Sequence, residues 1–163
     1  MIRFFRKGIQ EKIDLEPVRE FDLERYLGLW HEVARMDHRF ERGLTDVTAE
    51  YTLKEDGTIR VENSGWNIRK GERSKIIGHA KTTSVPGLLR VSFFWRFYSD
   101  YRVLMLDPDY QWVLVGSSNS KYLWILSRVE CLPKEIYDKI LIEVQRRGYD
   151  TKKVSISIMS KKK

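Results

Sequence analysis

Cysteine is nearly absent from this chain. Cys131 is its one cysteine, so an internal disulfide bond is excluded. The chain therefore either belongs in a reducing compartment or is stable without a disulfide. Histidine is scarce too, and His31, His38 and His79 lack the spacing of a metal site. We expect no metal and no cofactor.

Long apolar runs are missing as well. The longest extend over a few residues, far short of the ~20 that a membrane-spanning helix needs. Residues 1–8 have a basic start, but no apolar core or small-residue cleavage site of a signal peptide follows. Cys131 also lies too late in the chain to be the acylation site of a lipoprotein. As the sequence stands we expect a cytoplasmic protein; if an N-terminal signal has been removed, we expect the periplasm or the outer membrane.

Catalytic patterns are missing too. An enzyme needs a nucleophile, a metal cluster or an acid–base pair placed near a cleft. Asp37 and His38 are two parts of a hydrolase-like set, but no serine stands in the sharp-turn context that such enzymes use. We therefore expect no enzymatic activity and no catalytic residues.

Positive charge is what the chain has in excess. Its net charge is +7 and its pI is about 9.5, which suits acidic partners such as anionic lipid headgroups, fatty-acid carboxylates or nucleic acid. Lysine and arginine are nevertheless spread along the sequence, and residues 161–163 form the one dense run. A solvated basic surface explains this pattern without any partner.

The hydrophobic pattern indicates a β-protein. Hydrophobic residues make up 42% of the chain, enough for the core of one domain. After a short helical turn at residues 21–27, apolar runs alternate with turn residues, as in an antiparallel sandwich or barrel. The strands are expected near residues 30–38, 46–54, 58–66, 74–83, 88–96, 100–106, 111–117 and 122–128.

Both ends of the chain differ from this pattern. Ile136, Ile140 and Val144 share one face of an amphipathic helix that ends at Gly148, and the alternation of residues 154–158 predicts a last strand. We assign residues 21–163 to one domain. Residues 1–20 form an N-terminal extension, either a frayed end or a basic amphipathic segment lying on a membrane.

Short motifs along this pattern resemble those of one protein family. Residues 28–30 (Gly-Leu-Trp) precede the first strand, residues 106–110 (Leu-Asp-Pro-Asp-Tyr) lie in the middle, and residues 126–128 (Leu-Ser-Arg) close a later strand. In this order they resemble the lipocalins, and residues 40–43 (Phe-Glu-Arg-Gly) resemble the bacterial lipocalin group and its plant relatives. Pro108 stands where the family usually has threonine, and His31 where this group usually has tyrosine.

The resemblance implies an all-β fold. Lipocalins form an eight-stranded antiparallel up-and-down β-barrel, with a C-terminal α-helix packed outside it and a final short strand. At the narrow end of the barrel an arginine from the last barrel strand lies across a tryptophan, so the resemblance implies that Arg128 stacks on Trp30. Such a cation–π contact is worth roughly 0.5–2 kcal/mol. The structural floor residues implied in this way are Gly28, Trp30, Asp109 and Arg128.

Strand alternation then predicts which side chains face the ligand. An inward Trp30 places Glu32 inward as well, and small residues leave room for one small ligand in such a barrel. Residues 100–106 leave two alternatives, with either Arg102, Leu104 and Leu106 or Tyr101, Val103 and Met105 facing in. The pocket lining expected from alternation and resemblance is Ala34, Met36, His38, Ala49, Tyr51, Val61, Asn63, Gly78, Val91, Phe93, Leu104, Tyr122 and Trp124.

This lining is mostly apolar and aromatic. The resemblance therefore implies a protein that binds, stores or transports a small hydrophobic ligand, a fatty acid or lysophospholipid first of all, in connection with membrane lipid maintenance or stress. An anionic head is expected at a basic mouth, near Arg39, Arg42 and Arg96. Some lipocalins are isomerases with a pocket thiol, but Cys131 lies after the last barrel strand.

An alternative function remains open at this point. A barrel filled by its own side chains would act through its basic surface, on a membrane or on nucleic acid. Residues 93–98 alternate aromatic rings with Arg96 and so resemble a stacking platform for nucleic acid. A hydrophobic rim at the mouth of the barrel or a dimer patch explains these aromatic residues better. We expect a monomer or weak homodimer, contact with a membrane surface and no nucleic-acid partner.

Overall fold

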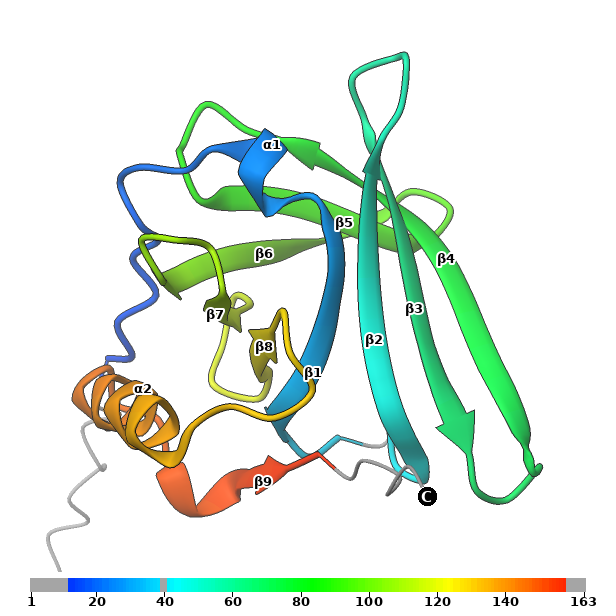
Figure 1. The fold of residues 1–163 in the computed structure, drawn as a ribbon. Coiled ribbons are helices and arrows are strands. Elements are labelled where there is room, and N and C mark those ends of the chain that lie inside the picture. Colours follow the sequence, from blue (N-terminus) through cyan, green and yellow to red (C-terminus); the bar gives the residue numbers. More distant parts are fainter. Residues whose placement is uncertain (1–11, 39–40, 158–163) are drawn as a thin grey trace, which may run out of the picture.

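The barrel is built from eight antiparallel strands (Figure 1). The structure, a computed structural model, describes residues 12–38 and 41–157. Each strand pairs with the next along the chain, and pairing of β1 with both β8 and β2 closes the barrel. The strands are β1 (Gly28–Met36), β2 (Leu44–Leu53), β3 (Ile59–Asn67), β4 (Glu72–Thr82), β5 (Leu88–Phe94), β6 (Phe97–Leu106), β7 (Trp112–Gly116) and β8 (Leu123–Ser127).

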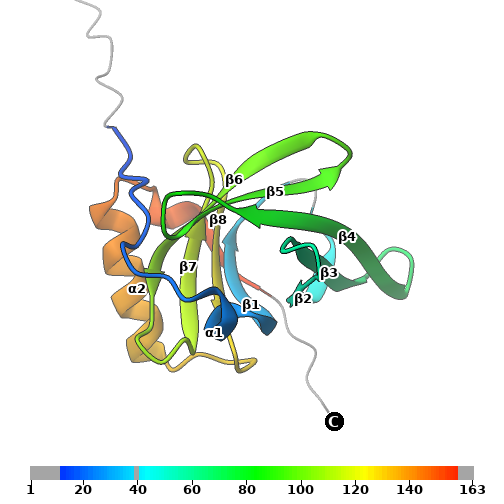
Figure 2. The ribbon, with the colours of Figure 1, turned by 90° about the horizontal axis from the view of Figure 1, so that it is seen from above.

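One helix crosses an end of the barrel, and the other lies outside its wall (Figure 2). Helix α1 (Leu23–Tyr26) crosses one end, and the Asp22 carboxylate caps it by accepting from two backbone N–H groups. Helix α2 (Lys134–Arg146) packs Ile140 and Val144 against the wall. A short 3₁₀ turn η1 (Thr151–Lys153) leads into β9 (Val154–Ile156), which pairs with β1. The predicted fold, with its outer helix and short final strand, is confirmed.

Two hydrophobic cores lie on opposite sides of the wall. The inner core fills one half of the barrel around Trp30, Tyr26 and Ile59. The outer core lies between the wall and α2, around Leu114 and Ile125. Strands β7 and β8 contribute side chains to both, so they are covered on both faces.

A β-bulge in β1 changes which of its side chains face inward. The pairing with β8 shifts by one residue between Glu32 and Ala34, so that Glu32 lies opposite the inner residue Leu126 but Ala34 lies opposite the outer residue Ile125. An extra residue in a strand inverts the alternation beyond it. Ala34 and Met36 accordingly belong to the outer core, which corrects the predicted inward facing.

A second bulge settles the facing of residues 100–106. The β6–β7 pairing shifts between Val103 and Met105. Tyr101, Val103 and Leu106 therefore belong to the inner core, a mixture of the two predicted alternatives. Leu104 lies in the outer core instead, so the prediction that it lines the pocket is wrong.

The described part of the N-terminal extension is bonded to the barrel. Val18 N donates to Val103 O at 2.8 Å, and Asp14 N donates to Arg147 O at 2.9 Å. The buried Arg147 guanidinium donates to the carbonyls of Asp14 and Leu104. Residues 12–20 thus run along the wall, whereas the predicted amphipathic segment lies almost wholly outside the described residues. Among the residues described, no helix has the length and apolarity to cross a bilayer.

Candidate ligand-binding site

One end of the barrel is closed by a stacked arginine. The Arg128 guanidinium carbon lies 3.8 Å from the centre of the Trp30 ring. The same guanidinium donates to the carbonyls of Leu29 at 2.9 Å and Arg25 at 2.9 Å, and Trp30 Nε1 donates to Tyr26 O at 2.8 Å. Carbonyls left unpaired where α1 meets β1 are therefore satisfied by one side chain. This is the arrangement that the resemblance implies.

The sequence also predicts Gly28 and Asp109 in the floor, and it does not predict a third residue, Tyr110, that the structure places there. Gly28 has φ +98°, and a Cβ there would lie 3.4 Å from an Arg128 nitrogen. Asp109 is exposed and offers its backbone carbonyl to Gln111, so its side chain does not enter the floor. Tyr110, whose hydroxyl accepts from Asp22 N at 2.8 Å, takes that place. The tyrosine that ends the motif of residues 106–110 is the sequence feature that could have pointed to it.

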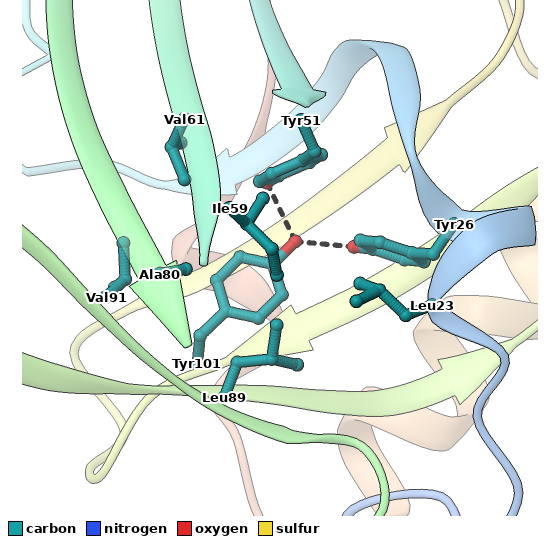
Figure 3. A pocket seen from close by; sticks show the side chains of 9 residues that line it. All are labelled: Leu23, Tyr26, Tyr51, Ile59, Val61, Ala80, Leu89, Val91 and Tyr101. Carbon is teal, nitrogen blue, oxygen red and sulfur yellow. Dashed lines mark hydrogen bonds between the residues drawn. The ribbon is translucent and has the colours of Figure 1, made fainter. Parts of the chain in front are cut away.

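Three tyrosines, the buried Tyr26 and Tyr51 and the partly buried Tyr101, fill the barrel above this floor (Figure 3). The Tyr101 hydroxyl lies 2.5 Å from that of Tyr26 and 2.8 Å from that of Tyr51. Burial raises the pKa of all three, that of Tyr51 to about 12, so each hydroxyl stays neutral. The cavity beside them has a volume of about 10 Å³ for the centre of a water molecule, room for about one water. Tyr51, Val61 and Val91 of the predicted lining surround this small space.

We call the other half of the barrel, where β4 and β5 are not paired, the open half. Strand β4 pairs with β5 only through residues His79–Thr82, and the β5–β6 hairpin leaves the wall beyond that point (Figures 1 and 2). Asn63 of β3 lies opposite Ala49 on one side and Ile76 on the other, which places all three on the inner face. Ile76 is nevertheless 51% exposed. The inner face of β4 is therefore accessible here.

Aromatic side chains line the opposite wall of this open half. Tyr122 and Trp124 of the β8 region stack at 6.0 Å with an interplanar angle of 17°. The His38 ring meets both edge-on, at 5.4 Å and 6.0 Å. These three predicted lining residues come together at the open end, and Phe93 packs against the inner core from β5.

Gly78 does not provide room for a ligand. A Cβ at this position would lie 2.3 Å from the carbonyl oxygen of Ser92 and 2.7 Å from Cδ1 of Phe93. The glycine lets β5 cross closely over β4 and lets the Phe93 ring cover it. The room for a ligand that Gly78 predicts is therefore occupied by the Ser92 backbone and the Phe93 ring.

A polar cluster lies among these aromatic rings. Because of the bulge, Arg35 faces inward, and its guanidinium bonds Glu32 at 2.8 Å and Glu41 at 3.2 Å. The Ser157 hydroxyl donates to Glu32 at 2.6 Å, and Trp124 Nε1 donates to Glu41 at 3.2 Å. Sequence reasoning missed Arg35, because the residue pattern gives no sign of the bulge, and it missed Glu41, which lies in the turn before β2.

The two carboxyls of this cluster titrate in opposite directions. Burial and the neighbouring Glu41 raise the pKa of Glu32, whereas bonds from His38 and Arg35 hold the pKa of Glu41 below its usual range despite burial. Near neutral pH the pair therefore favours one shared negative charge, balanced by Arg35. The inner face carries almost no free charge at this point.

The three arginines predicted at the mouth are not gathered there. Arg39 lies outside the described residues. Arg42 is exposed in the turn before β2 and pairs with Asp37 at 3.3 Å. Arg96 lies at the β5–β6 turn, with its guanidinium 5.3 Å from the centre of the Trp95 ring. The structure shows no common anion site for Arg42 and Arg96.

A second hollow of about 600 Å³ lies on the outside of β1–β4. Its lining combines charged side chains, among them Glu50, Glu62, Arg73 and Lys75, with the apolar side chains of Leu29 and Trp66. Within the described part of the chain, no group of three or more histidine, cysteine or acidic residues could hold a metal ion.

Comparison with known proteins assigns the family. The family model described as a lipocalin-like domain matches residues 21–158. This chain is a lipocalin. It is 44% identical to "Outer membrane lipoprotein Blc" of Vibrio cholerae over 90% of the chain and 86% of that lipocalin. It is 45% identical to the protein of that name from Escherichia coli K12, over 83% of the chain and 78% of the relative.

More distant lipocalins agree. "Temperature-induced lipocalin-1" of Arabidopsis thaliana is 37% identical over 88% of the chain and 82% of its own length, which supports the predicted bacterial group with plant relatives. Insecticyanin of Manduca sexta superposes with a TM-score of 0.75 at 24% identity, over 91% of this chain and 86% of that one, and shows the shared fold. As a lipocalin, the chain belongs to a family that binds and transports small hydrophobic ligands.

Proposed function

We propose that this lipocalin binds one single-chain lipid, a fatty acid or a lysophospholipid, in the open half of its barrel. The observation that carries the proposal is the asymmetry of the inner face. One end is sealed by Arg128 and Trp30 and filled by the tyrosines. The other carries the exposed Ile76 and the half-buried rings of Tyr122 and Trp124 on the same inner face. A tail can therefore enter from one side only.

The energetics suit an acyl tail. Transfer of apolar ligand surface from water supplies about 25 cal/mol per Å², less the cost of immobilising the ligand. The filled tyrosine end limits how deep the tail reaches, so it lies between β4 and the aromatic wall of β8. Residues in contact with it are Asn63, Ile76, Phe93, Tyr122 and Trp124.

The head of the ligand stays outside. An unpaired carboxylate or phosphate inside an apolar site is very costly, and Arg35 is already bonded to Glu32 and Glu41. Because its charge is already balanced by this acidic pair, Arg35 offers little attraction to a second anion. The tail therefore enters first, and the head remains at the rim within reach of the exposed Arg42.

Titration with an environment-sensitive fatty-acid analogue tests this function. We expect saturable binding at one site and displacement by unlabelled fatty acids and lysophospholipids. Trp124→Ala is expected to weaken binding, whereas Ile142→Ser, on the exposed face of α2, is a matched control that leaves it unchanged. Absence of saturable binding across lipids, sterols, retinoids and tetrapyrroles would refute the proposal.

A filled, non-binding barrel is the second candidate. The observation that favours it is the small volume, about 10 Å³, of the cavity next to the tyrosines. Such a protein would act through its basic surface. Retention on heparin that depends on salt, with no lipid-induced change in tryptophan fluorescence, would support this function instead.

The relatives' names bear on location and assembly. The bacterial proteins are called outer membrane lipoproteins, which supports a periplasmic or outer-membrane location for this chain over a cytoplasmic one. Cell fractionation tests this. We further propose a monomer or weak homodimer without enzymatic activity, and concentration-dependent size-exclusion chromatography tests the oligomeric state.

A further inference from the structure

The tip of the β5–β6 hairpin, residues 94–97, carries three exposed aromatic rings. Phe94 is 71% exposed, Trp95 74% and Phe97 71%. The hairpin projects from the barrel (Figure 2). Aromatic rings of this size are normally buried, and three of them at one turn form a local apolar patch with no packing role in either core.

Local structure fixes these rings outward. Trp95 adopts φ +48°, a left-handed conformation that is costly for a bulky residue. Its carbonyl accepts from the Ser92 hydroxyl at 3.2 Å, and the Phe94 and Phe97 rings stack at 6.0 Å. The neighbouring Phe93 points the other way, onto Gly78. Strain retained at an exposed turn points to a function for its side chains.

Charge identifies the surface that fits this tip. Arg96 holds its guanidinium beside the Trp95 ring, at 5.3 Å from the ring centre. Arg90 and Arg102, further along the hairpin, are both bonded to Asp100. A second copy of this chain would bring like charges together, since the net charge is +7. A bilayer with anionic headgroups attracts the arginine and accepts aromatic rings at its interface.

We propose that residues 94–97 insert into the surface of an anionic lipid bilayer, and that the barrel takes up its ligand there. The tip adjoins this half of the barrel, because Phe93 packs onto Gly78 of β4 and the next residue, Phe94, is exposed. A lipid leaving the bilayer next to the tip reaches the exposed inner face of β4 directly. The uptake of a ligand from the bilayer rests on the proposed function, whereas the insertion of the tip into the bilayer does not.

Vesicle binding tests the docking. Cosedimentation is measured with mixed phosphatidylcholine–phosphatidylglycerol vesicles and with pure phosphatidylcholine vesicles. Phe94→Ser/Phe97→Ser is expected to weaken binding to mixed vesicles at least about tenfold, and Arg96→Gln severalfold. Ile142→Ser removes an equally exposed apolar side chain from α2 and is expected to change nothing.

Two further measurements keep the outcomes distinct. Quenching of tryptophan fluorescence by brominated lipids is expected in the parent and lost in Trp95→Phe. Uptake of a fluorescent lysophospholipid from vesicles is expected to slow in the double variant, while its affinity for the same probe in free solution stays unchanged. Binding of the free probe without vesicle binding would overturn the docking alone, and vesicle binding without probe binding would overturn the proposed function alone.

Other results also decide the question. Equal vesicle binding by the parent and the double variant would overturn the proposal, as would equal quenching in Trp95→Phe. A parent that self-associates through the tip, becomes monomeric in the double variant and ignores vesicles would show that the tip binds a second copy instead.

Discussion

Arg128 holds the closed end together as a single side chain. Beyond its stacking on Trp30, it donates to the carbonyls of Tyr110, Leu29 and Leu27. We expect Arg128→Ala to lower the free energy of unfolding by about 1–3 kcal/mol, because these acceptors lose their donor. Urea denaturation measures the change, with Arg42→Ala as the control at an exposed ion pair. An unchanged midpoint would mean that the contact contributes nothing.

Gly78 offers a second prediction at this scale. Gly78→Ala places a methyl group against the Ser92 backbone and the Phe93 ring, so the strand crossing must shift. We expect a loss of about 1–3 kcal/mol in unfolding free energy. Thr82→Ala, at an exposed position of the same strand, serves as the control. Thermal melts of the three proteins compare them, and a melting temperature equal to that of the parent would contradict the tight crossing.

The sequence predicts some single residues well and others badly, for a physical reason. Trp30 and Arg128 are recognisable because each sits in a short motif with a fixed role. Unbroken alternation predicts that Ala34, Met36 and Leu104 face inward. The bulges in β1 and β6 invert this alternation, and a bulge leaves no mark in residue type when no glycine forms it.

At the scale of elements, β9 and the buried acid are linked. Strand β9 pairs with β1 at residues 34–36, beyond the end of the β1–β2 pairing. Ser157, just after β9, donates to Glu32. Arg35 and Glu41 also act on that carboxyl, and His38 in turn contacts Glu41. The raised pKa of Glu32 means that the folded protein keeps the proton over a pH range in which the unfolded chain loses it. Rising pH above the ordinary value of 4.5 therefore disfavours folding through this group.

Glu32→Gln tests this linkage. The variant cannot ionise, so its stability relative to the parent is expected to increase as the pH rises from about 5 toward 8. Urea denaturation at several pH values measures the difference, and Glu50→Gln, exposed on β2, is the control. A difference between parent and variant that stays constant with pH would show that Glu32 titrates normally in the folded protein.

The order of the elements was largely predictable. Alternation and turn residues indicate all eight barrel strands, and the change of period after Pro133 indicates α2. The pattern predicts a β5–β6 turn at residues 97–99, whereas β5 ends at Phe94 and β6 begins at Phe97. The tight turn depends on the left-handed backbone of Trp95, and a tryptophan gives no sign of such a turn.

At the scale of the whole molecule, charge governs how the head of a ligand binds. With a net charge of +7, we expect fatty-acid affinity to fall modestly with rising salt, because the tail supplies most of the free energy. Arg42→Ala is expected to cost about 1 kcal/mol or less for a fatty acid and almost nothing for the matching alcohol. Calorimetric titration of both ligands measures this. Equal binding of acid and alcohol by the parent would refute the position of the head.

The division into two cores also affects how fast different strands open locally. Strands β7 and β8 are covered by the inner core on one face and by α2 on the other, whereas residues 72–77 of β4 have exposed side chains and pair with β3 alone. Local opening requires least free energy where least is packed. Amide hydrogens of residues 112–116 and 123–127 are thus expected to exchange slowest, and those of residues 72–77 fastest. One half of the barrel is then expected to stay closed while the other opens locally, and hydrogen exchange with and without lipid would measure the rate of this opening.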